Sequence, residues 1–243
     1  MSVVNNRIKR EIEKFTSIAS KWWDSRGPFK MLHEINPIRL EYIVSSIVKH
    51  YDVKDNNFFT KLSVLDVGCG GGIASIPLAR LGFKVTGIDP GAENIESATN
   101  AAKLQTLDAE FLSASCEDLI EQKKVFDIVL CLEVLEHVDN PENFIKSLSQ
   151  LVQKDGILIL STINRNLKSK LLAIYAAEYL LRLVPAGTHE WQKFLKPSEL
   201  VNFCAKNRLK CLDISGMTYE LLKGKWKITK DIDVNFFCSF RKI

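Results

Sequence analysis

The fold is decided by the stretch Val64-Leu65-Asp66-Val67-Gly68-Cys69-Gly70-Gly71-Gly72, in which an apolar run leads into an acidic residue and a glycine-rich turn. A short apolar run bounded by glycines is typical of a buried strand in a parallel sheet. Glycines at alternate positions permit positive φ angles and let a ligand approach the main chain without meeting a Cβ atom. The stretch therefore predicts a strand followed by a nucleotide-binding turn.

A second predicted strand supplies an acidic partner for this turn. The run Phe83-Lys84-Val85-Thr86-Gly87-Ile88 ends on Asp89. This residue follows Gly70 by about twenty positions, the interval expected for a carboxylate that binds the ribose hydroxyls of a nucleotide. The dinucleotide pattern G-x-G-x-x-G would need a glycine where the chain has Ile73, so the pattern favours S-adenosylmethionine over NAD. A tight turn without a ligand is the alternative, and the two carboxylates, Asp66 and Asp89, weigh against it.

Composition indicates one globular domain. The chain has 243 residues, of which 46% are hydrophobic and 26% charged, and α/β chains of this length are commonly single domains. The net charge of +4 is too small to indicate a nucleic-acid partner. Six scattered cysteines without a C-x-x-C pair predict reduced core thiols of a cytosolic protein.

Strands and helices alternate from Leu62 onward, which predicts a parallel sheet with helices on both faces. The expected strands end at Val67, Ile88, Leu112, Leu132 and Leu160, with helices near 73–81, 94–103 and 141–151 between them. Two last strands, 209–214 and 234–240, would close the sheet. Pro77 lies inside the first of these predicted helices, which is unfavourable for a helix interior.

Two further segments flank this alternating core. Residues from Lys9 to about His50 predict helix with a break at Gly27-Pro28, placed so that it could cap the nucleotide site. The apolar stretch Leu167 to Val184 has flanking basic residues and is too short and too charged to span a bilayer. It predicts an interfacial helix drawn to an anionic membrane surface, and packing on the core or on a second subunit is the alternative.

The glycine turn, Asp89 and the run from Phe126 to Val138 together resemble class I S-adenosylmethionine-dependent methyltransferases. Three more groups of residues narrow the resemblance to the ubiquinone-biosynthesis O-methyltransferases. They are Trp22-Trp23-Asp24 with Phe29 to His33 and Asn36 to Leu40; Ser161 to Asn166; and Val184 to His189 with Lys193 to Pro197. The likeness runs from about Glu11 to the C-terminus.

This resemblance implies an α/β, Rossmann-like fold with a seven-stranded, mostly parallel sheet. It implies a single domain over residues 1–243. Within it we expect an N-terminal helical cap (1–60), a cofactor-binding core (61–160), an insertion (165–190) and a C-terminal closure of the sheet (191–243).

The resemblance also implies cofactor-binding residues. Gly68, with Gly70 and Asp66 in the same turn, would approach the methionine end of S-adenosylmethionine, and Asp89 would hold the ribose. Arg39 would pair with the amino-acid carboxylate, for which a guanidinium is well shaped, and Leu132 would lie beside the cofactor. The alternatives are that Arg39 is a surface charge and that Leu132 is simply sheet core.

Methyl transfer to a phenol also needs removal of a proton, because a free phenol titrates near pH 10. Glu133, Glu136 and His137 follow the fourth strand, at the edge where open α/β sheets bind ligands. If this segment is helical, the three side chains share a face and could hold Mg²⁺, as the resemblance to eukaryotic relatives also implies. Helix capping by the glutamates and packing of His137 is the alternative, and His189 is a rival general base.

The resemblance implies O-methylation of a polyprenyl phenol in ubiquinone biosynthesis, with 2-polyprenyl-6-hydroxyphenol and 3-demethylubiquinol as substrates. Two alternatives stay open: another small-molecule or quinone C-methyltransferase, and an inactive cofactor-binding scaffold. We expect a cytoplasmic protein, peripherally associated with the inner face of the membrane, with other quinone-biosynthesis proteins as further partners and no nucleic acid.

Overall fold

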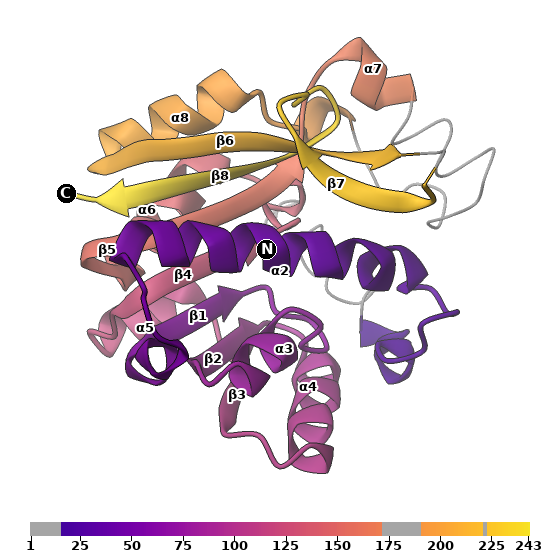
Figure 1. The fold of residues 1–243 in the computed structure, drawn as a ribbon, viewed down its shortest axis with the longest axis vertical. Coiled ribbons are helices and arrows are strands. Elements are labelled where there is room, and N and C mark those ends of the chain that lie inside the picture. The colour runs from indigo at the N-terminus through magenta and orange to yellow at the C-terminus, as the bar shows by residue number, and fades with distance from the viewer. Residues whose placement is uncertain (1–15, 172–190, 221–222) are drawn as a thin grey trace, which may run out of the picture.

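A computed structural model of the chain describes residues 16–171, 191–220 and 223–243. Its centre is a sheet of eight strands in the order β3-β2-β1-β4-β5-β8-β6-β7 (Figure 1). The strands are β1 (Ser63–Val67), β2 (Lys84–Asp89), β3 (Ala109–Ser113), β4 (Phe126–Leu132), β5 (Val152–Ile163), β6 (Leu209–Glu220), β7 (Lys225–Thr229) and β8 (Asn235–Lys242). The first five pair in parallel, while β8 pairs antiparallel with β5 and β6, and β7 antiparallel with β6.

Helices cover both faces of this sheet (Figure 1). On one face lie α5 (Cys116–Glu121), α6 (Pro141–Leu151) and α8 (Pro197–Lys206). On the other lie α2 (Lys30–Tyr51), α3 (Ser75–Arg80) and α4 (Ala92–Leu104). Strand β4 is largely apolar because both of its faces are buried. Val129 and Cys131 pack in the core beneath α5, α6 and α8, whereas Ile128 and Leu130 pack in the core beneath α2 and α3.

Helix α2 starts beside the glycine turn, where Asn36 contacts Ile73, and ends at the opposite edge of the sheet, where Tyr51 contacts Asp127 at the start of β4. Apolar residues at helical spacing, from Ile35 through Ile47, are buried against the central strands. The predicted helix from Lys9 does not continue to the break at Gly27-Pro28: after Thr16 the chain forms only a short 3-10 turn, η1 (Ala19–Lys21), and the regular helix starts after Gly27-Pro28.

Two other expectations are revised. The sheet has eight strands, not seven, because residues 225–229 form an additional antiparallel strand at its edge. Pro77 is accommodated because it lies in the first turn of α3, where a backbone N–H has no partner within the helix in any case. The predicted order of the other strands and of α3, α4 and α6 is confirmed.

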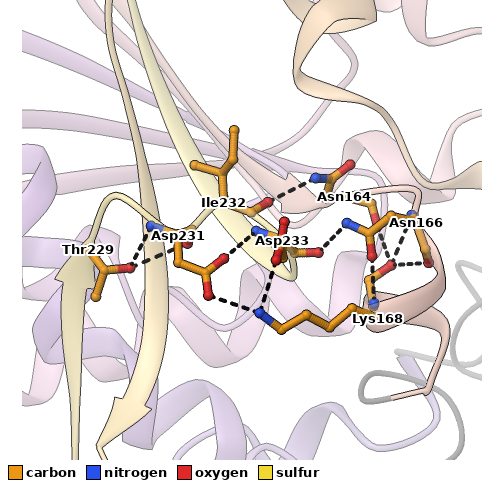
Figure 2. Close-up of polar contacts among 8 residues, drawn as sticks. Asn164, Asn166, Lys168, Thr229, Asp231, Ile232 and Asp233 are labelled. Atoms are coloured by element: carbon orange, nitrogen blue, oxygen red, sulfur yellow. Dashed lines mark hydrogen bonds and ion pairs between the residues drawn. The ribbon is translucent and has the colours of Figure 1, made fainter.

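The chain leaving β5 is fastened to the turn between β7 and β8. Lys168, in the short helix α7 (Leu167–Ser169), donates to Asp231 Oδ2 at 2.9 Å and to Asp233 Oδ2 at 3.0 Å (Figure 2). The amide groups of Asn164 and Asn166 donate to the carbonyls of Ile232 and Asp233 in the same turn (Figure 2). The start of the predicted insertion is therefore fixed by side-chain contacts, and residues 172–190, which include the rest of the apolar stretch and His189, lie outside the described part of the chain.

Candidate functional site

The glycine turn follows β1 and is bonded to the end of β2. Gly68, Gly70 and Gly72 have φ angles of 73°, 52° and 82°, values that L side chains rarely adopt. The N–H groups of Gly68 and Cys69 both donate to the carbonyl of Ile88, at 2.8 and 3.0 Å. This pairing fixes the turn at the carboxyl edge of the sheet, the position predicted from the sequence.

Asp89 lies directly beside this turn. Its Oδ1 accepts hydrogen bonds from the Gly91 N–H at 2.8 Å and the Asn94 amide at 3.0 Å, and its Oδ2 accepts from the Gly70 N–H at 3.1 Å. The carboxylate is thus oriented by its own loop. Oδ2 has one hydrogen-bond donor among the described residues, which leaves it able to accept from a ligand hydroxyl.

Asp66, at the end of β1, is enclosed behind the turn. Ser75 Oγ donates to its Oδ2 at 2.5 Å. Burial raises the pKa of Asp66 to about 6; the Ser75 hydrogen bond and the positive charge of Arg39 oppose that rise, and Asp89 adds to it. Asp66 therefore stabilises the turn from behind through Ser75, at the start of α3.

Arg39 is the most unusual polar group at this edge. Its side chain is only 5% exposed, and its Nη2 lies 3.6 Å from Glu133 Oε1, too far for a hydrogen bond. Nε and Nη2 have no hydrogen-bond partner in the described residues. The alternative of a surface charge is wrong. A buried guanidinium with unpaired N–H groups beside a nucleotide turn fits a ligand carboxylate.

Trp22 covers the turn from the N-terminal side. Its ring stacks on Phe29 with centroids 3.7 Å apart, and its indole N–H donates to Asn94 Oδ1 at 2.8 Å. A Cβ placed on Gly70 would come within 2.5 Å of this ring. Glycine is therefore needed at position 70 for packing as well as for its φ angle.

At the end of β4 the chain turns sharply, and the regular helix considered for residues 133–137 is not formed. Leu132 is 9% exposed and belongs to the core that faces α2. Glu133 has a φ angle of 55°; its N–H donates to the carbonyl of Ser161, whose hydroxyl donates to Glu133 Oε1 at 2.8 Å. The helical turn that follows, η3 (Leu135–His137), is only one 3-10 turn long. The proposed common face of Glu133, Glu136 and His137 is therefore not formed by a helix.

Glu136 is a buried carboxyl group. It is 4% exposed, and its Oε2 accepts a hydrogen bond from Thr162 Oγ1 at 2.8 Å. Burial, reinforced by the nearby charge of Glu133, raises the pKa of Glu136 to about 7, whereas His137 and Thr162 oppose the rise. A carboxyl group with such a pKa can exchange a proton near neutral pH.

These residues do not fit a preformed metal site. Across the described ranges, no three His, Cys, Asp or Glu side chains are grouped so as to hold a metal ion. Glu133 is directed towards Arg39 and Ser161, and Glu136 towards Thr162.

Sequence reasoning missed several residues that orient the site: Ser75, Asn94 and Asn36, whose amide donates to the carbonyl of Ile73 at 2.8 Å. Asn94 could have been found, because an amide five residues after Asp89 is close enough to reach it at a helix start. The contacts of Ser75 and Asn36 depend on how helices pack and leave no local signal. The six cysteines form no disulfide, and five are buried, as predicted.

Comparisons with known proteins define the class. A family model described as a methyltransferase domain matches residues 39–213, more than half of the chain. The crystal structure of magnesium protoporphyrin IX methyltransferase from Synechocystis PCC 6803 with bound SAH shares the fold, with a TM-score of 0.69 and 20% identity, covering 98% of this chain and 100% of that chain. The glycine turn and acidic strand end thus belong to a class I S-adenosylmethionine-dependent methyltransferase.

Relatives at higher identity specify the family. The ubiquinone biosynthesis O-methyltransferase of Pelagibacter ubique is 44% identical, covering 98% of this chain and 100% of that protein. The enzyme of the same name from Rickettsia typhi is 45% identical, covering 100% of this chain and 95% of its own length. The chain belongs to the family of ubiquinone biosynthesis O-methyltransferases, as the sequence resemblance predicted.

Proposed function

We propose that the protein transfers the methyl group of S-adenosylmethionine to a phenolic oxygen of 2-polyprenyl-6-hydroxyphenol and of 3-demethylubiquinol. The observation that carries the cofactor assignment is the buried guanidinium of Arg39, whose Nε and Nη2 have no hydrogen-bond partner in the described residues. In the proposed complex Arg39 binds the methionine carboxylate, Asp89 the ribose, and Gly68 and Gly70 approach the sulfonium end. Leu132 contributes an apolar wall.

The chemistry requires alignment and one proton transfer. An O–CH₃ bond forms as the S–CH₃ bond breaks, and an in-line displacement of this kind depends mainly on holding the reacting atoms in position. The phenolic proton goes to a base. We propose His137 as that base and Glu136 as the carboxylate that stabilises the resulting imidazolium, since the two groups interact electrostatically. His189 stays the rival base.

Mass spectrometry of the product tests the proposal. The protein would be incubated with methyl-labelled S-adenosylmethionine and a short-chain catechol, and the position of the label determined. A label on oxygen supports O-methylation of a polyprenyl phenol, and a label on ring carbon would instead identify a quinone C-methyltransferase. Binding of the cofactor without any turnover would identify an inactive scaffold. Comparing His137→Ala with His189→Ala then decides which histidine accepts the proton.

Mg²⁺ is a separate proposal about Glu133, Glu136 and His137. Because these side chains are not grouped as ligands in the structure, binding would require Glu133 to leave Ser161 and turn towards Glu136. Exhaustive chelation followed by titration of Mg²⁺ tests it. Full activity after chelation, measured at a saturating concentration of the catechol, would show that the reaction does not need Mg²⁺.

We also propose that the protein works at an anionic membrane surface, where its polyprenyl substrates reside, together with other quinone-biosynthesis proteins. The described residues contain no helix long and apolar enough to cross a membrane. Leu167 and Leu171 are 74% and 61% exposed, which supports an interfacial role. The basic residues beside this segment give less support to binding of an anionic surface, because Lys168 is paired with two aspartates (Figure 2) and Arg165 is paired with Glu199. Sedimentation with anionic liposomes at low salt is the test, and failure to sediment would refute membrane binding.

A further inference from the structure

A second buried polar atom at the nucleotide edge has no partner. Asn36 lies in α2 and is 8% exposed. Its side-chain nitrogen donates to the carbonyl of Ile73 at 2.8 Å, directly after the glycine turn. Its side-chain oxygen, Oδ1, is buried and has no hydrogen-bond partner among the described residues. A buried acceptor without a donor is costly, so the site calls for a donor that a ligand would supply.

The orientation of this amide is fixed by chemistry. The carbonyl of Ile73 can only accept a hydrogen bond, so the Asn36 nitrogen must face it and Oδ1 must point elsewhere. The atom of this amide that is left without a partner among the described residues is therefore an acceptor, not a donor.

Arg39 follows Asn36 by three residues, so the two side chains leave α2 from neighbouring positions on one face. Among the described residues, Arg39 Nε and Nη2 lack an acceptor and Asn36 Oδ1 lacks a donor. A zwitterionic amino acid supplies both, since its carboxylate and ammonium are attached to the same carbon atom. The pair is therefore complementary to the amino-acid end of the cofactor.

We propose that Asn36 Oδ1 accepts a hydrogen bond from the α-ammonium group of S-adenosylmethionine and of its product S-adenosylhomocysteine. The inference rests on the proposed function, because it uses Arg39 as the carboxylate site. It adds a residue that recognises the ammonium group and so selects ligands that carry it.

Calorimetry with paired ligands tests this role. Wild type and Asn36→Leu would each be titrated with S-adenosylhomocysteine, with the analogue in which hydrogen replaces the α-ammonium, and with 5′-methylthioadenosine, which lacks the amino-acid end. Asn36→Leu is expected to lose about ten-fold or more in affinity for S-adenosylhomocysteine, as for a hydrogen bond to a charged group. For the other two ligands the change should be under about two-fold on the same basis. Glu41→Gln, on the exposed face of the same helix, is the matched control and should bind all three ligands as wild type does.

The outcomes separate the two proposals. Failure of the wild type to bind S-adenosylhomocysteine would overturn the cofactor site and this inference together. If the wild type binds it, an equal loss for all three ligands in Asn36→Leu would mean that Asn36 only holds the turn at Ile73. No loss at all would mean that the ammonium group of the ligand does not contact Oδ1. Either result overturns the ammonium contact and leaves the proposed function intact. Thermal unfolding of the variant, with methylthioadenosine binding, shows whether its adenosine site is folded.

Discussion

Replacing Glu136 by glutamine is expected to stabilise the ligand-free protein at neutral and alkaline pH. Burial raises the pKa of this carboxyl group from its ordinary 4.5 to about 7, so the folded chain holds the proton more tightly than the unfolded chain. The stability associated with that proton is complete below pH 4.5 and is lost as the pH rises to 7. A shift of this size corresponds to about 3 kcal/mol.

Glutamine keeps the neutral form at every pH, and its side-chain oxygen can still accept the hydrogen bond from Thr162. The free energy of unfolding of Glu136→Gln should therefore exceed that of the wild type by about 3 kcal/mol above pH 7.5, with little difference near pH 5. Turnover should fall in the same variant, because the negative charge beside His137 is lost.

Urea unfolding from pH 5 to 8.5, without ligand, measures this difference. Asp66 also has a raised pKa, but it is present in both proteins and cancels in the comparison. Glu121→Gln, an exposed position, is the matched control and should change stability little at any pH. A Glu136→Gln variant whose stability relative to wild type does not depend on pH, or which is less stable at pH 8, would refute the reasoning.

Three further substitutions test the cofactor site. Arg39→Met should weaken S-adenosylhomocysteine binding by about 3 kcal/mol, for two charge-assisted hydrogen bonds, and should leave 5′-methylthioadenosine binding little changed; equal losses in calorimetry would contradict the carboxylate assignment. Asp89→Ala should weaken both ligands by about 1.5–3 kcal/mol, because both contain the ribose, and unchanged affinity would exclude a ribose contact. Trp22→Phe keeps an aromatic ring beside Gly71 and removes the hydrogen bond to Asn94 together with the indole atoms that lie over Gly70. It should lower the free energy of unfolding by at least about 1 kcal/mol, the contribution of one hydrogen bond, and denaturation curves that match wild type would show that this bond contributes nothing.

The parallel core was predictable because its signals are local. Short, largely apolar runs predict buried strands, as in β1, β2 and β4, and the glycines that follow β1 predict its turn. Strand β7 was missed because its sequence, Lys225-Trp226-Lys227-Ile228-Thr229, is half polar, as suits an edge strand with one face towards α2. The position of β7 depends on its pairing with β6, and the five residues of β7 contain no sequence pattern that predicts this pairing.

The site was predictable only in part, for a similar reason. Asp89 was located by its distance from the glycine turn. The helical spacing assumed for Glu133 failed because this residue takes a positive φ angle, held by Ser161 on the neighbouring strand. Nothing within the segment from Glu133 to His137 indicates that contact.

The contacts around Trp22 explain why the core residues resemble methyltransferases in general, whereas the N-terminal residues helped to identify one family. The glycine turn and Asp89 need only their own loop to form a nucleotide site, and such a site is shared by many methyltransferases. Trp22 joins that site to the N-terminal region through an unbroken chain of hydrogen bonds: Asp89 to Asn94, Asn94 to the Trp22 indole, and the Trp22 carbonyl to His33 in α2. The same helix carries Asn36 and Arg39, which have buried side-chain atoms without hydrogen-bond partners among the described residues. The N-terminal residues that narrowed the resemblance are therefore joined to the glycine turn by direct contacts, and they include the two residues proposed to bind the amino-acid end of the cofactor. On the proposed assignments, a chain that began after α2 would keep Asp89 for the ribose and would lose Asn36 and Arg39, the groups that distinguish S-adenosylmethionine from adenosine.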